Sequence, residues 1–150
     1  MCVARSAARL SVQRSAQSLV EFALVLPLIT LLFLGAVDLT RAFYYYIGLE
    51  NASREAARVL IDFPYEYDDS VGCTVGNREG LPYVNVSCAS GTLVISPAAN
   101  TTVSPPNRKP GRQPITVTAS TNFTPITPLV RNFTGGTITL RASTTMLTWY

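Results

Sequence analysis

The chain has 150 residues, 47% of them hydrophobic and 14% charged, and its formal net charge is +3. Arg5, Arg9 and Arg14 lie within the first 16 residues, so the remainder carries nine basic and nine acidic residues, which argues against a nucleic-acid partner. The absence of histidine excludes Ser-His-Asp and Cys-His catalysis and zinc sites that use imidazole. No phosphate-binding loop or metal-ligand cluster is recognisable, so we expect no enzyme activity, no metal, no cofactor and no small-molecule substrate.

The first third of the chain has the pattern of a membrane anchor. A basic leader, residues 1–16, precedes a run of 16 uncharged residues, 22–37, near the lower limit of about 17–25 for a helix that crosses a bilayer. Glu21 and Asp38 bracket this run, and because charges inside a bilayer are costly, we expect them to mark its two interfaces. The arginines upstream predict a cytoplasmic N-terminus and an exported C-terminal region.

The helical pattern continues past Asp38 and becomes amphipathic, with Leu39, Phe43 and Ile47 at four-residue spacing. The apolar stripe continues with Ala52, Ala56, Val59 and Leu60. We predict one helix over residues 17–63, ended by Pro64, whose second half packs under a head domain. Asp38 and Arg41 form either an interfacial pair or the first solvated turn after the membrane, and we favour the solvated turn.

Pro27 lies inside the predicted helix, where it removes one backbone hydrogen bond. The resulting bend either serves helix packing or is tolerated without a role, and the sequence favours neither interpretation.

Residues 64–150 are rich in Thr, Ser, Pro and β-branched residues, which predicts an exported head domain of strands and turns. We predict short strands at Tyr83–Cys88, Thr92–Ser96, Ile115–Asn122 and Thr137–Trp149. The fold class expected is therefore α+β, with a long N-terminal helix and a small head built mainly of β-sheet.

Cys73 and Cys88 are the two cysteines downstream of the anchor. An exported head favours a disulfide between them, closing a loop of about 15 residues, over the alternative of two unpaired thiols.

The N-terminal motifs resemble those of one family. The sequence is similar to the TadE-like pseudopilins of the tight-adherence (Flp, type IVb) pilus system. The matching residues are 17–27, Val37–Asp38, Arg41, Phe43–Tyr46 and Asn51–Arg58. The resemblance implies a minor pilin or pseudopilin that takes part in pilus assembly and adhesion, anchored by one span in the bacterial inner membrane. Its partners would be the membrane, a prepilin peptidase, the major pilin and other pseudopilins.

The same resemblance implies cleavage between Ala16 and Gln17. Alanine stands where the family usually has glycine, but it is still small enough for a narrow cleavage pocket. Glu21 would then neutralise the new N-terminal amine, often that of a neighbouring subunit, as the helix enters an apolar bundle. Ser18 and Glu21 also have the spacing of a capping box, which is a simpler role for Glu21 and is compatible with the first. The alternative function is an uncleaved, signal-anchored extracellular binding module, such as an adhesin unrelated to pilus assembly.

Overall fold

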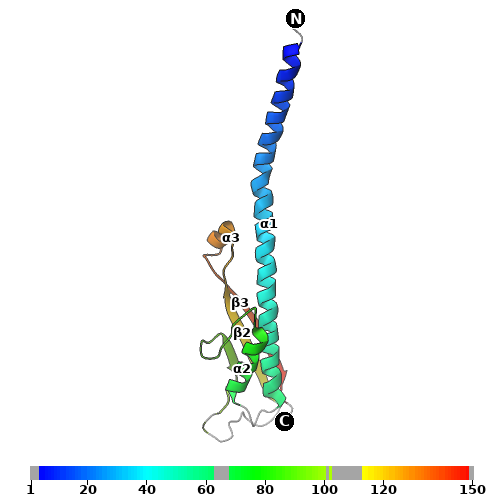
Figure 1. The fold of residues 1–150 in the computed structure, drawn as a ribbon. Coiled ribbons are helices and arrows are strands. Elements are labelled where there is room, and N and C mark those ends of the chain that lie inside the picture. Colours follow the sequence, from blue (N-terminus) through cyan, green and yellow to red (C-terminus); the bar gives the residue numbers. More distant parts are fainter. Residues whose placement is uncertain (1–3, 63–67, 101, 103–112, 149–150) are drawn as a thin grey trace.

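The computed structural model describes residues 4–62, 68–100, 102 and 113–148. A long helix and a small head built on its C-terminal part form the α+β fold that the sequence predicts (Figure 1). In chain order the elements are α1 (Ala4–Asp62), α2 (Asp69–Gly80), β1 (Leu93–Ser96), β2 (Pro114–Phe123), α3 (Pro128–Phe133) and β3 (Ile138–Leu147).

Helix α1 has 59 residues and is therefore about 90 Å long at 1.5 Å per residue. It begins at Ala4 rather than near Ser18, the start expected from the sequence. The leader contains neither proline nor glycine and is rich in alanine and arginine, which favour helix, so nothing in it interrupts the helix. The expected end at Phe63 and Pro64 lies outside the described residues, and α1 ends at Asp62.

The head contains a three-stranded antiparallel sheet in the order β1-β2-β3. In the register of the central strand, Val117 pairs with Ile95 on one side and Thr144 on the other. Apolar side chains of β2 at Ile115, Val117 and Ala119 are buried, and both β2 and β3 contact α1. The opposite face of β2 and β3 carries hydroxyl groups that form hydrogen bonds in pairs. Thr116 pairs with Thr145 at 2.8 Å, and Thr118 pairs with Ser143 at 3.1 Å. We call this the hydroxyl face.

The core uses only the later part of the apolar stripe that we predicted on α1. Leu39 and Phe43, expected beneath the head, are 73% and 61% exposed. Ala52, Ala56 and Leu60 are buried as predicted, together with Leu49 and Ala57, and Tyr45 is partly buried. Spacing alone does not say where along the helix the head core begins.

Helix α2 was not predicted, because its three glycines and its β-branched residues disfavour an isolated helix. Gly72, Gly76 and Gly80, spaced by four, are all buried and lie along one side of α2. A Cβ atom on Gly76 would lie 2.9 Å from Leu93 Cδ2 and 3.2 Å from the carbonyl oxygen of Ala52, so glycine is needed for the close approach of α2 to α1. At its start the side chain of Asp68 accepts a 3.0 Å hydrogen bond from the amide of Ser70 and caps the helix.

The strand expected at Tyr83–Cys88 is absent. Val84 and Val86 are buried and alternate with exposed Tyr83 and Asn85, so the alternation that suggested a strand is real. The segment pairs with no strand among the described residues, and its two valines cover the α1–α2 contact beside Gly48 and Gly80. The other three predicted strands correspond to β1, β2 and β3.

A disulfide joins Cys73 of α2 to Cys88, just before β1, with 5.8 Å between the Cα atoms. Both half-cystines pack against the hydrophobic core. The bond therefore ties α2 to the segment that leads into the sheet.

Candidate membrane anchor and helix–head junction

The N-terminal half of α1 exposes its apolar side chains. From Gln17 to Val37 every described residue except the half-buried Gly35 is exposed, including seven leucines and two phenylalanines. By length and composition this is the one described helix apolar enough to cross a membrane, and none of its most apolar window is buried by the head. Such a surface is unfavourable in water, so the helix is compatible with a membrane anchor.

Glu21 lies at the start of this exposed apolar surface, one helical turn after Gln17. The side-chain amide of Gln17 donates a 3.3 Å hydrogen bond to Glu21 Oε1. In the described chain α1 passes continuously through Ser18, so no helix begins there and the predicted capping box is not formed. The peptide bond between Ala16 and Gln17 is part of the same helix, and whether it is cleaved stays a prediction.

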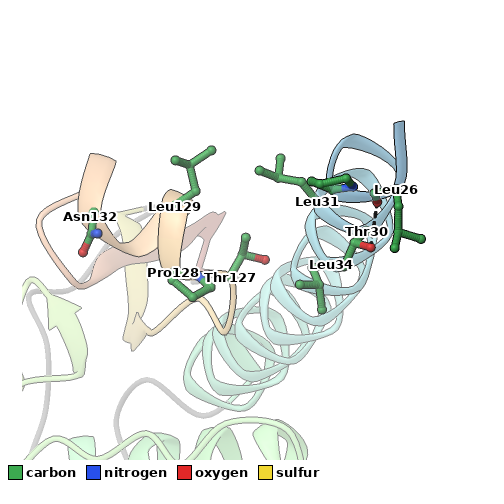
Figure 2. A pocket seen from close by; sticks show the side chains of 9 residues that line it. Leu26, Thr30, Leu31, Leu34, Thr127, Pro128, Leu129 and Asn132 are labelled. Carbon is green, nitrogen blue, oxygen red and sulfur yellow. Dashed lines mark hydrogen bonds between the residues drawn. The ribbon is translucent and has the colours of Figure 1, made fainter. Parts of the chain in front are cut away.

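Pro27 lies within α1, and the helix continues on both sides of it. Proline cannot donate the hydrogen bond to the carbonyl four residues earlier, which is that of Ala23. One turn further on, the hydroxyl of Thr30 donates to the carbonyl of Leu26 at 2.9 Å, a contact that often accompanies helix bending (Figure 2). The role of Pro27 stays open.

Asp38 joins the anchor to the head. The residue is only 5% exposed, so the favoured interpretation of a solvated turn was wrong, and Asp38 instead forms an ion pair with Arg41. The amides of Ile126 and Thr127 donate to its two carboxylate oxygens at 2.8 Å each, and Arg41 lies 3.4 Å away as an ion-pair partner. The guanidinium of Arg41 also lies over the ring of Phe123, 5.3 Å from its centroid.

The hydrogen bond from the amide of Ile126, assisted by that of Thr127 and by Arg41, holds the pKa of Asp38 below its ordinary value. These interactions outweigh burial, which acts in the opposite direction. We call this arrangement the Asp38 clamp. It fixes the segment before α3 to the helix surface and keeps the carboxylate charged at neutral pH.

Aromatic side chains surround the next turn of α1. Tyr45 turns inward and meets Phe123 edge-to-face at 5.6 Å between ring centroids, while the more exposed Tyr44 stacks on Tyr83 at 5.7 Å. Tyr46 stays exposed. Tyrosines are common at the water interface of membrane proteins, so their place just beyond Asp38 agrees with an interface at this level.

Helix α3 and the N-terminal half of α1 enclose an open, mainly apolar groove of about 540 Å³. Figure 2 shows Leu31 and Leu34 of α1 on one side and Pro128 and Leu129 of α3 on the other. The short α3 was not predicted as a helix. Pro128 is its first residue, a position at which proline favours helix initiation.

Among residues 17–61, 68–100, 102 and 113–148, no three Cys, Asp or Glu side chains are grouped closely enough to hold a metal ion.

These features define a class of protein: a small α+β head built directly onto a long helix whose exposed apolar half is compatible with a single membrane anchor. Residues 16–58 match the family model of TadE-like proteins. The match confirms, for this segment, the resemblance inferred from the sequence. It covers less than a third of the chain and ends within the part of α1 that packs against the head. Comparisons with curated proteins and with solved structures gave no match.

Proposed function

We propose that the protein is a TadE-like minor pilin or pseudopilin, a non-enzymatic component of tight-adherence pilus assembly that contributes to adhesion. It is anchored in the bacterial inner membrane by α1, with a cytoplasmic N-terminus and an exported head. The observation that carries this proposal is the family match over residues 16–58, which contains the expected cleavage point, the exposed apolar helix and the first turns of the head core.

The geometry at the start of the apolar surface supports processing by a prepilin peptidase. Cleavage after Ala16 would give Gln17 a free amine, and the contact already made between Gln17 and Glu21 shows that this carboxylate lies on the side of the helix facing residue 17. A carboxylate in apolar surroundings is stabilised by a nearby cation. Glu21 is therefore suited to pair with the new amine of its own chain or of a neighbouring subunit.

Exposure of the anchor supports a role in assembly. The apolar half of α1 has no intramolecular partner over most of its surface, and Gly35 has no neighbouring atom within 4 Å of the position a Cβ would take. Small residues permit close contact between helices in membranes. Lateral packing with the helices of the major pilin and other pseudopilins would cover this surface.

The first experiment is the intact mass and N-terminal sequence of the full chain, purified from membranes of a host that has its own prepilin peptidase. We expect a mature chain that starts at Gln17. A host lacking the peptidase is the control, and there the chain should keep its leader. A chain that starts at Met1 or Cys2 in both hosts would refute processing and favour the uncleaved, signal-anchored binding module.

A pair of charge variants tests the role of Glu21. Glu21→Gln should abolish incorporation into pilus complexes while leaving the head folded, because the amine would lose its counter-charge. Glu50→Gln is the matched control: Glu50 is on the same helix, but it forms a half-exposed ion pair with Arg54 at 3.2 Å. Equal assembly by wild type and Glu21→Gln would contradict the proposed role.

A further inference from the structure

The loop that carries α3, residues 124–137 and here called the α3 loop, exposes large apolar side chains. Ile126 and Leu129 are more than half exposed, and Phe133 is 94% exposed. Figure 1 shows α3 standing away from the sheet and alongside α1, on the side of the head that faces the N-terminus. An exposed apolar cluster of this kind in a loop indicates contact with another apolar phase.

The level of the α3 loop along α1 is fixed by contacts. The Asp38 clamp holds its base, and from there the loop turns back toward the N-terminus and forms the groove with Leu26 to Leu34. These α1 residues precede Asp38 by 4 to 12 positions, or about 6 to 18 Å along the helix axis. The α3 loop therefore lies beside the apolar run 22–37 and not beyond its end.

No alternative placement of the span leaves the α3 loop in water. A span that ended before Leu26 would have to use the helix between Arg14 and Val25, which contains Glu21. That segment is only about 18 Å long, against a hydrocarbon thickness of about 30 Å. If α1 crosses the membrane, the α3 loop must lie at the depth of the lipid.

Part of the backbone of the α3 loop suits this environment, because an unpaired amide in lipid is costly and five of its amides have partners. The amides of Ile126 and Thr127 donate to Asp38, that of Arg131 to the carbonyl of Thr127, and those of Thr134 and Gly136 to Val130 and Arg131. Pro125 and Pro128 have no amide hydrogen to satisfy.

We propose that the α3 loop is a second membrane-embedded element, which inserts Ile126, Leu129 and Phe133 into the leaflet on the head side. Acyl chains of lipid fill the groove between α3 and α1. Arg131, which is exposed and forms no ion pair with a described residue, extends toward the lipid phosphates. The proposal rests on the membrane span proposed for α1, and the experiment below separates the two.

The test uses the full chain in vesicles of phosphatidylcholine and phosphatidylglycerol, with phosphatidylcholine brominated in its acyl chains as the quencher of tryptophan fluorescence. The sequence has a single tryptophan, so Trp149→Phe provides a background without one. Into it we place Phe133→Trp as the probe, Phe33→Trp as the control within the span, and Val94→Trp as the control on the head. All three positions are at least half exposed, and the far-UV circular dichroism of each variant checks that it is folded.

We expect brominated lipid to remove most of the emission from Phe133→Trp and Phe33→Trp and to leave that of Val94→Trp unchanged. Quenching of Phe33→Trp without quenching of Phe133→Trp would overturn the inference and leave the span intact. If Phe33→Trp is also unquenched, α1 does not span, and both proposals fail. If brominated lipid does not quench the emission from Phe133→Trp, but that emission changes with the density of protein in the vesicle, a neighbouring protein helix covers the loop. This result also overturns the proposal.

Discussion

The contact between α1 and α2 predicts that Gly72→Ala lowers the stability of the wild-type chain but raises that of a chain in which Leu60 is truncated to alanine. A Cβ atom on Gly72 would lie 2.7, 3.0 and 3.3 Å from the Cδ1, Cγ and Cδ2 atoms of Leu60, and these are the three atoms nearest to it. Leu60 is fully buried, so it has little room to rotate away. Gly72→Ala should therefore overpack the core of the wild-type chain.

The magnitudes follow from two opposing effects. Overpacking costs about 1–3 kcal/mol, and alanine is preferred to glycine inside a helix by about 1 kcal/mol. Gly72→Ala should thus lower the free energy of unfolding of the wild type by about 1 kcal/mol. Leu60→Ala alone should lower it by about 2–5 kcal/mol. With Leu60 truncated the clash is gone, and Gly72→Ala should raise stability by about 1 kcal/mol, a coupling of about 2 kcal/mol.

The assay is urea unfolding of the full chain in detergent micelles, followed by near-ultraviolet circular dichroism, which reports the packing of the head. Leu49→Ala supplies the control background. Leu49 is equally buried, but none of its atoms is among the three nearest to a Cβ on Gly72. There Gly72→Ala should remain destabilising. If Gly72→Ala destabilises the Leu60→Ala chain as much as the wild type, Leu60 does not limit the approach of the two helices and the reasoning is refuted.

Three further predictions concern single features. Because the pKa of Asp38 is lowered, its contribution to stability is present above its unfolded pKa of about 3.9 and is lost as the pH falls through the lower folded value. The difference in Tm between wild type and Asp38→Asn should therefore be full at neutral pH and shrink below about pH 4, and a difference independent of pH would contradict the clamp. Replacing Cys73 and Cys88 by serine should lower the free energy of unfolding by about 3 kcal/mol, measured by urea titration, since the bond closes a 15-residue separation; an unchanged midpoint would refute this. Pro27→Ala should restore the hydrogen bond to the carbonyl of Ala23 and slow hydrogen exchange in this turn, and equal exchange would show that the turn is already held by other contacts.

The sequence predicts features that depend on local pattern or on a constraint of the chain. The apolar run and its basic flank indicate the long helix, and the alternation of residues in the C-terminal region indicates β1, β2 and β3. The Cys73–Cys88 pair could be predicted because two cysteines downstream of the apolar run allow only one pairing. In each case the evidence lies within a few residues of the feature or in the number of residues of one type.

The features that sequence reasoning missed depend on contacts between distant segments. Asp38 accepts hydrogen bonds from the amides of Ile126 and Thr127, which are 88 and 89 positions away. Nothing in the sequence next to Asp38 distinguishes such a carboxylate from a solvated one. Helix α2 forms against its own propensities because packing on Ala52 and Ala56 stabilises it. The spacing of Gly72, Gly76 and Gly80 was the signal available, and it becomes informative once a helix with small residues is known to lie opposite.

The continuity of α1 has a consequence for any assembly that contains this protein. The same unbroken helix forms the anchor and one wall of the head core, and the Asp38 clamp joins the two regions at their boundary. The head therefore cannot swivel about the helix axis independently of the anchor. A neighbour that packs against one side of the apolar run therefore also determines the direction, around the axis of α1, in which the hydroxyl face of the sheet points. The direction in which the hydroxyl face points is thus set by how the apolar run of α1 packs against its neighbours.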